Sequence, residues 1–347
     1  MKKKVLAVLV SATMVFALAA CGTADSSSTG ESGSSGGEAA SDGTYTIAFS
    51  QGDNGNSWRV TSTNDMEETA KEYGFNYIWA DAGADPSKQL SDIEDLLAQK
   101  PDILIVDPVE SEACTPCVDM AAEADVPLIT IDRAVNAEIG TGTYVANIEQ
   151  DFVEVGRLAA QYAVDYLTEK NGSASGKVLL ITGTVGSSPN TDEEAGINEV
   201  LAEYPDIEIL DNQSGDYMRA TARTVMDDYL NKYPEGSVDC IISFNDEMSF
   251  GAYQAMQDAG RTDLVGAIIS KDGMKDALEE IINGNFYACV QCTPYFGEVT
   301  MDLAQKILDG EEYESEISIP FVCFDMGENA EATQEYYDTL VEKNLDY

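Results

Sequence analysis

Residues 85–107 read DPSKQLSDIEDLLAQKPDILIVD, and they contain one complete helix pattern and one complete strand pattern. Asp85 followed by Pro86 is typical of a helix start, because the carboxylate caps free backbone N–H groups and proline fits the first helical turn. One face of the expected helix carries Leu90, Ile93, Leu96 and Leu97. Residues 103–107 are almost continuously apolar, as expected for a parallel strand that helices cover on both faces. The stretch therefore predicts one strand–helix unit of an α/β fold.

The same alternation of short apolar runs and helical patterns continues along the chain. A first series of strands is predicted at residues 45–50, 75–80, 103–107, 127–131 and 143–146. A second series is predicted at residues 177–182, 207–211, 239–244, 264–270 and 286–291. This alternation favours parallel sheets with helices on both faces, and the length of 347 residues is enough for two domains. We therefore predict an α/β fold of two Rossmann-like lobes that face each other across a cleft.

The first 43 residues have the composition of an export signal followed by a tether. Lysines at positions 2–4 precede an apolar run at 5–20, which is short for a transmembrane helix. The run ends in Leu18-Ala19-Ala20-Cys21, which resembles a bacterial lipobox, whose cysteine receives the lipid. We expect a signal peptide at residues 1–20 and a lipidated, flexible Gly/Ser-rich linker at residues 21–43. The lipid on Cys21 would then be the only contact with the membrane.

Composition excludes several classes of function. The chain has 63 Asp and Glu against 19 Lys and Arg, a formal charge of −44, so nucleic acid is not an expected partner. There is no histidine, which excludes Ser-His-Asp and Cys-His catalysis and His-ligated zinc. No calcium-binding loop pattern is present. We expect a binding protein rather than an enzyme, with no catalytic residues, no cofactor and no metal.

The cysteines allow three interpretations. Cys114 and Cys117 are spaced C-x-x-C, and so are Cys289 and Cys292. A strand directs residues three apart to opposite faces, which argues against a shared metal for the second pair. Buried free thiols are the favoured interpretation, and a Cys114–Cys117 disulfide or a metal site are the alternatives.

Polar and aromatic side chains gather just after the predicted strands, where ligands bind in open α/β sheets. The candidate ligand-binding residues are Asn56, Trp58, Arg59, Asp132, Arg133, Tyr217, Asn245, Asp272 and Gln291. Carboxylates, amides and Arg donors can pair with the hydroxyl groups of a sugar, and aromatic rings can cover its C–H face. Structural alternatives remain: Trp58 could belong to the core, Asp132 could cap a turn and Asn245 could cap a helix.

A family resemblance becomes specific at these residues. From Tyr45 onward the chain resembles the type I periplasmic-binding superfamily in its ribose-binding-like sugar branch, and most of all the galactofuranose-binding members that serve ABC transporters. The motifs are Phe49-Ser50-Gln51, Trp58-Arg59, Asp132-Arg133, Gly183-Thr184-Val185-Gly186-Ser187, Gln213-Ser214-Gly215-Asp216, Asn245-Asp246-Glu247-Met248 and Asp272-Gly273.

The resemblance implies an N-terminal lobe of residues 44–147 and 293–322, a C-terminal lobe of residues 148–292 and 323–347, and a hinge of three segments. It also implies roles. Asp132 and Arg133 would clamp ring hydroxyls from one lobe, Asn245 and Asp272 would do so from the other, and Arg59 would add donors. Trp58 and Tyr217 would flank the ring, and Gln291 or Cys292 would add a polar contact near the hinge.

One position departs from the family pattern. The family usually has Arg-x-x-Gly-Phe in the second lobe, whereas this chain has Glu193 in the place of the Arg, followed by Gly196 and Ile197. A carboxylate in the cleft would reverse one local charge. We therefore expect a changed specificity, toward an amino-bearing or differently hydroxylated ligand.

The function expected from these observations is that of a monomeric, lipid-anchored protein outside the cytoplasm, which binds a small sugar and delivers it to an ABC permease. A ligand-sensing role for a chemoreceptor or sensor kinase is the alternative, because it uses the same fold. A transcription regulator would need a DNA-binding segment and a basic surface. A secreted glycosidase would need two carboxyl groups at a defined separation, which sequence alone does not exclude.

Overall fold

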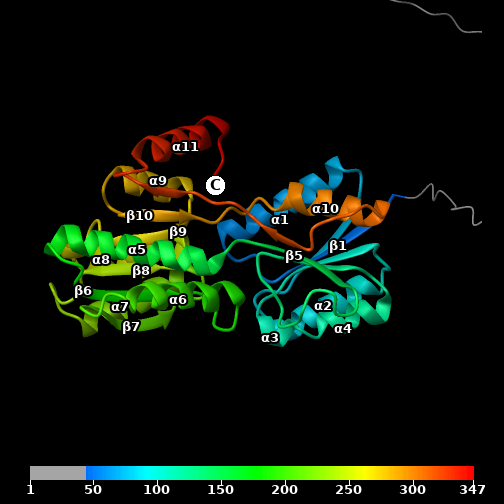
Figure 1. The fold of residues 1–347 in the computed structure, drawn as a ribbon, viewed down its shortest axis with the longest axis horizontal. Coiled ribbons are helices and arrows are strands. Elements are labelled where there is room, and N and C mark those ends of the chain that lie inside the picture. Colours follow the sequence, from blue (N-terminus) through cyan, green and yellow to red (C-terminus); the bar gives the residue numbers. More distant parts are fainter. Residues whose placement is uncertain (1–43) are drawn as a thin grey trace, which may run out of the picture. The chain divides into compact units, whose positions relative to one another are not determined.

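Two six-stranded sheets organise residues 44–347, the part of the chain that the computed structural model describes (Figure 1). The strand order is β11-β5-β4-β3-β1-β2 in the first sheet and β12-β10-β9-β8-β6-β7 in the second. All pairs in the first sheet are parallel. In the second sheet only β12 pairs in the antiparallel sense. The predicted two-lobed α/β fold is confirmed, with β12 as an antiparallel edge. The segments expected to form the signal peptide and the linker, including Cys21, lie outside the described residues.

The first lobe consists of the first sheet and the helices on its faces. Its strands are β1 (Thr46–Gln51), β2 (Asn76–Asp81), β3 (Ile103–Asp107), β4 (Leu128–Ile131), β5 (Tyr144–Glu149) and β11 (Glu316–Ser318). Its helices are α1 (Ser57–Glu72), α2 (Pro86–Leu97), α3 (Ser111–Cys114), α4 (Cys117–Ala124) and α10 (Gly297–Asp309). Helix α10 comes from the C-terminal part of the chain and packs against α1 (Figure 1).

The second lobe is built from the second sheet in the same way. Its strands are β6 (Gly176–Thr182), β7 (Ile207–Ser214), β8 (Cys240–Ser243), β9 (Ile268–Asp272), β10 (Ala288–Gln291) and β12 (Cys323–Asp325). Its helices are α5 (Phe152–Asn171), α6 (Ser188–Leu201), α7 (Arg219–Lys232), α8 (Asp246–Asp258), α9 (Lys275–Ile282) and α11 (Ala330–Lys343), with a short 3₁₀ turn η1 (Thr262–Leu264). Two predicted strands begin later than expected, at Ile268 and Ala288. For β9 the reason is local, because Leu264 belongs to the 3₁₀ turn and Gly266 has φ +76°.

The chain passes between the lobes after β5, after β10 and after β11, which gives three connecting segments. Strand β5 stays in the first sheet as far as Glu149, beyond the lobe boundary expected at residue 147. No helix among residues 44–347 is long and apolar enough to cross a membrane.

The stretch at residues 85–107 folds as its pattern predicts, and it also prepares the site. Asp85 caps α2 by accepting hydrogen bonds from the N–H groups of Ser87 and Lys88. Every residue of β3 is buried. The buried Gln89 side chain donates to the Asp107 carbonyl (2.8 Å) and accepts from the Val109 N–H (2.8 Å). Helix α2 therefore fixes the loop that follows β3.

All six cysteines of the described part of the chain carry free thiols, and all but the partly buried Cys323 are buried. Cys114 ends α3 and Cys117 begins α4, so the two do not share one continuous helix. The Cys114 thiol donates to the Gln89 side chain at 3.1 Å. The favoured interpretation of buried free thiols is consistent with these positions. Within residues 44–347 no group of three or more Cys, Asp or Glu side chains could hold a metal ion.

Helices α5 and α6 approach each other closely through two glycines. A β-carbon on Gly156 would overlap the Glu193 carbonyl oxygen, and one on Gly196 would overlap the Val153 carbonyl oxygen. Both contacts involve backbone, which cannot rotate away. The two glycines therefore set the position of Glu193 within α6.

We expect Gly156→Ala to lower the free energy of unfolding by about 3 kcal/mol, because the added methyl group forces the two backbones apart. Urea denaturation of the purified protein measures this change. The control is Gln161→Ala on the exposed face of α5, which should change stability little. Equal stability of the two variants would contradict the close packing of α5 on α6.

Candidate functional site

A small cavity with a volume of about 30 Å³ lies between the two lobes, at the carboxyl ends of their strands. Its wall consists of Asn56, Trp58, Arg59, Asp132, Arg133, Pro189, Tyr217, Asn245, Lys271, Asp272 and Cys292. The structure thus brings together all of the predicted ligand-binding residues except Gln291.

Gln291 lies outside the cavity wall. Its side-chain amide donates to the Tyr336 hydroxyl of α11 at 2.8 Å, on the other side of the strand end. Successive residues of a strand point to opposite sides, so the next residue, Cys292, reaches the cavity instead. Cys292 therefore takes the place of Gln291 among the candidate ligand-binding residues.

Sequence reasoning also missed Pro189 and Lys271. Lys271 had a visible signal, because it directly follows the apolar run that predicts a strand ending at residue 270 and directly precedes the candidate Asp272. Pro189 had none, since its place on the wall depends on how α6 meets the first lobe.

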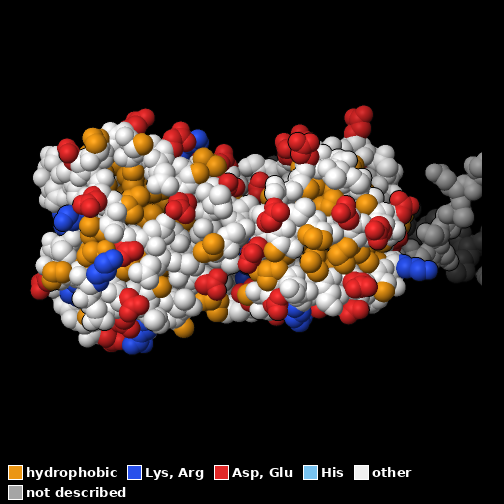
Figure 2. All heavy atoms as spheres, turned by 90° about the horizontal axis from the view of Figure 1, so that it is seen from below, with side chains coloured by type: hydrophobic (Ala, Val, Ile, Leu, Met, Phe, Trp, Pro, Cys, Tyr) orange, Lys and Arg blue, Asp and Glu red, His pale blue; other side chains and the backbone are white. Residues whose placement is uncertain are grey.

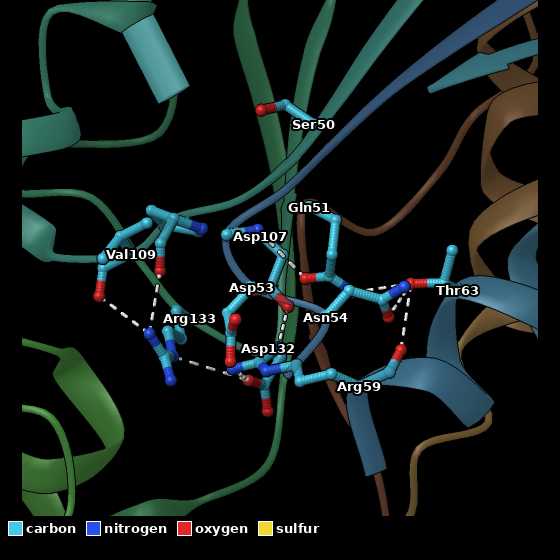
Figure 3. Close-up of polar contacts among 12 residues, drawn as sticks. Ser50, Gln51, Asp53, Asn54, Arg59, Thr63, Asp107, Val109, Asp132 and Arg133 are labelled. Atoms are coloured by element: carbon cyan, nitrogen blue, oxygen red, sulfur yellow. Dashed lines mark hydrogen bonds and ion pairs between the residues drawn. The ribbon is translucent and has the colours of Figure 1, made fainter. Parts of the chain in front are cut away.

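Arg59 is the centre of the polar network in the first lobe (Figure 3). Its guanidinium is ion-paired with Asp107 at the end of β3 and with Asp132 after β4, the latter at 2.9 Å. These three side chains are almost completely buried. Arg133 is held by the backbone, since its Nη1 donates to the Val109 carbonyl at 2.7 Å. Both Arg side chains are thus fixed before any ligand enters.

Two asparagines link the lobes through one carbonyl group. Asn56 caps α1, and Asn245 caps α8. The side-chain amide of each also donates to the Tyr217 carbonyl oxygen, at 3.3 Å in both cases. Asp216 and Tyr217 have φ values of 57° and 55°, a left-handed conformation that costs energy in non-glycine residues and is concentrated at functional sites. The capping role considered for Asn245 is therefore real, and it coexists with a place on the cavity wall.

The two aromatic walls are held by different means. The Trp58 indole N–H donates to the Cys292 carbonyl at 2.7 Å. The Trp58 ring packs edge-on against the Phe296 ring, with 6.1 Å between the ring centres. The Tyr217 ring lies directly on Gly183, where any β-carbon would overlap it. Both rings are nearly completely buried. A flat ligand could lie against these surfaces.

The second lobe contributes a group of buried acids. Asp272 ends β9 with φ 114°. Burial raises the pKa of its carboxyl group well above the ordinary value, with the neighbouring Asp246 adding to the effect and Lys271 opposing it. Asp246 accepts hydrogen bonds from the N–H groups of Gly273 (2.9 Å) and Met274 (2.7 Å), which fixes the turn after β9. Burial therefore favours the protonated form of the Asp272 carboxyl group, which is the form that can donate a hydrogen bond.

Glu193 does not reach the cavity wall. It is 1% exposed and lies behind Lys271, whose Nζ is 3.3 Å from its Oε2. Burial raises the Glu193 pKa to about 7, although Lys271 opposes this shift. Its negative charge is paired with a lysine and is not presented to a ligand.

Contacts around the cavity hold the lobes together. The Ala134 N–H donates to the Ser188 hydroxyl (2.8 Å), and the Ser111 N–H donates to the Gly186 carbonyl (2.9 Å). The Ser57 hydroxyl lies 2.7 Å from both Glu247 Oε1 and the Tyr347 hydroxyl. These contacts join the two lobes around the cavity.

Residues 47–312 match the family described as the periplasmic binding protein domain. The chain belongs to this family. It is a family of binding proteins, so the expectation that the chain is not an enzyme is confirmed. The ribose import binding protein RbsB of Bacillus subtilis (strain 168) is 33% identical over 80% of this chain and 86% of that relative.

Two solved structures extend the likeness to the three-dimensional fold of periplasmic binding proteins. The crystal structure of a galactofuranose binding protein has a TM-score of 0.79 and 26% identity, and the match covers 87% of this chain and 100% of the other. The fructose binding periplasmic domain of a hybrid two component system has a TM-score of 0.75 and 26% identity. The match covers 86% of this chain and 97% of that domain. The resemblance to a ribose-binding-like sugar branch is confirmed, and galactofuranose binders are one group among several similar ones.

We expect Arg59→Met to lower the free energy of unfolding by about 3–5 kcal/mol, because it leaves the buried Asp107 carboxylate without an ion-pair partner and Asp132 with only the more distant Arg133. Urea denaturation measures the change. The matched control is Arg157→Met on α5, whose ion pairs with Glu154 and Glu199 are exposed and should contribute little. A similarly small effect of both substitutions would show that Arg59 does not hold the network.

Proposed function

We propose that this protein is a lipid-anchored binding protein outside the cytoplasm, which captures a neutral monosaccharide, or a related small polyhydroxylated molecule, and delivers it to an ABC permease. The observation that carries the proposal is the cavity between the lobes, in which fixed polar side chains and two aromatic rings meet. Sugar hydroxyls both donate and accept hydrogen bonds, which suits a wall with carboxyl, amide and guanidinium groups.

The balance of charge favours an uncharged ligand. The positive groups on the wall are Arg59, Arg133 and Lys271. The negative groups paired with them or close to them are Asp107, Asp132 and Glu193. Asp272 adds little charge, since its raised pKa favours the protonated form. The sum is close to zero, so a ligand with a net charge would have no counterion.

The relatives support a sugar of furanose-forming type. Those named above are described as binding ribose, galactofuranose and fructose. The candidate ligand residues for this chain are Asn56, Trp58, Arg59, Asp132, Arg133, Tyr217, Asn245, Lys271, Asp272 and Cys292.

The location follows from the N-terminal sequence and from the surface. The lipobox-like segment ending at Cys21 and the Gly/Ser-rich linker are typical of a tethered lipoprotein. Figure 2 shows Asp and Glu side chains spread over both lobes on this face, with few Lys and Arg among them. Such a surface suits a highly soluble, monomeric protein.

A sensing role is the second candidate. It is favoured by the similarity to the fructose binding periplasmic domain of a hybrid two component system. The two roles use the same site and differ in the membrane partner. Co-purification from the native membrane with a permease and its ATPase, or with a sensor kinase, distinguishes them.

We expect D-ribose, D-galactose or D-fructose to raise the melting temperature by about 5 °C at a concentration of 100 times the Kd, because only the folded protein binds the sugar. Differential scanning fluorimetry measures the shift. No shift with any neutral sugar or polyol would contradict the proposal.

Asp272→Ala tests whether this cavity is the binding site. The side chain makes no ion pair within the described residues, so its removal should leave the fold intact and weaken binding at least about tenfold. Isothermal titration calorimetry measures the Kd. Asp258→Ala on the surface of α8 is the matched control. Unchanged affinity of the Asp272 variant would place the sugar elsewhere.

Cys21→Ser tests the anchor. In a bacterial host that processes lipoproteins, the wild-type chain should fractionate with membranes and the variant should be soluble, because serine cannot receive the thioether-linked lipid. Immunoblotting of the two fractions measures the distribution. Membrane association of the variant would point to another anchor.

A further inference from the structure

Lys271 is a buried lysine on the wall of the cavity. It lies in β9, a strand whose residues are all buried, and it is 4% exposed. Removing an ammonium group from water costs several kcal/mol unless nearby groups compensate. An apolar residue would serve the packing of β9 better, so the position of this charge requires a reason beyond the core.

The counterion of Lys271 is equally buried and points at it from behind. Glu193 Oε2 is 3.3 Å from Lys271 Nζ, which makes the two groups an ion pair, and both side chains are almost completely buried. Glu193 is held by the close contact of its carbonyl oxygen with Gly156. The pair is therefore a charge contact in which the carboxylate is fixed and the ammonium group faces the cavity.

The remaining neighbours of the ammonium group are aromatic faces. Lys271 Nζ is 5.1 Å from the centre of the Phe152 ring and 5.2 Å from that of Tyr217. Such contacts stabilise the charge, but they do not accept a normal hydrogen bond. A lysine ammonium has three N–H donors, and the one ion-pair partner of Lys271 among residues 44–347 is Glu193, so donors remain for a ligand.

Other donors at this side of the cavity are also unused. The Tyr217 hydroxyl and Arg133 Nε are buried and have no hydrogen-bond partner within the described residues. The Arg133 guanidinium lies 5.5 Å from the centre of the Tyr217 ring, so the ring stands between two cations, one from each lobe. Buried donors are rarely left without acceptors. A ligand that supplies oxygen atoms here would satisfy them.

We propose that Lys271 binds the ligand directly, donating a hydrogen bond to an oxygen atom of the bound neutral sugar, and that Glu193 acts as its fixed counterion and positioning residue. This inference rests on the proposed function and adds a specificity-determining residue to it. An ammonium group on the ligand at this place would be repelled by Lys271. The position of Glu193 therefore removes the reason for expecting an amino-bearing ligand.

The test compares variants by isothermal titration calorimetry. The probe is whichever of D-ribose, D-galactose and D-fructose raises the wild-type melting temperature most. We expect Lys271→Met to weaken binding by about 100-fold, because a charge-assisted hydrogen bond is lost. The double variant Lys271→Met/Glu193→Leu removes both buried charges, so it should fold well and lose binding to the same degree.

A matched control and a third variant separate binding from folding. Lys232→Met on α7 removes an exposed lysine of the same lobe and should bind like the wild type. Glu193→Gln keeps the Lys271 ammonium group as a donor and removes only its negative counterion, so this variant should weaken binding less than Lys271→Met. Restoring a cation in Lys271→Arg should recover part of the affinity, which a purely structural role would not predict.

The outcomes separate the proposed sugar binding from the role of Lys271 in it. If the wild type binds none of the three sugars, the proposed function for these ligands fails, and the role of Lys271 fails with it. If the wild type binds and the folded double variant binds equally tightly, only the role of Lys271 is overturned. If the double variant loses binding while its melting temperature stays near that of the wild type, the inference is supported.

Discussion

The Arg59 guanidinium joins the segments from which the first lobe builds its half of the site. It stands in the first turn of α1 and pairs with acids that follow or end two neighbouring strands, β3 and β4. Parallel strands bring these acids to one edge, where their charges would repel each other without a cation. With Arg59 in place, Asp132 is fixed beside the cavity, and the helix that carries Trp58 and Asn56 is fixed as well. The site in this lobe therefore depends on one buried cation.

The fold followed from local patterns because those patterns and the tertiary structure agree. The cap at Asp85 and the buried strand β3 require only short-range information, and the alternation of such units leads to parallel sheets. Residues at the carboxyl ends of strands could be proposed as a site for the same reason. The exact ends of the strands could not be predicted in this way. Whether Gln291 or Cys292 faces the cavity depends on a shift of one residue, and that shift is decided by β9 and α11, which pack against the strand end.

Pairings between distant residues were also beyond the sequence. Glu193 departs from the family pattern in a way that suggests a reversed charge in the cleft, but its effect depends on Lys271, far along the chain. Only the packing of α6 on α5 through Gly156, and the direction of β9, place the two charges together. A single departure from a family pattern is therefore weak evidence for a changed ligand until its neighbours in space are known.

Each lobe neutralises its own buried charges, and this has a consequence for opening and closing. Arg59 pairs with Asp107 and Asp132 inside the first lobe, and Lys271 pairs with Glu193 inside the second. Separation of the lobes would break hydrogen bonds such as those from Asn56 to the Tyr217 carbonyl and from Ala134 to Ser188, together with the contact of Arg133 with the Tyr217 ring, but no ion pair of the described residues. Water can replace these hydrogen bonds at little cost in free energy, whereas breaking a buried ion pair would cost more. The lobes can thus part by a hinge motion of the three connecting segments while each half of the site keeps its geometry, so a ligand would meet side chains that are already in place.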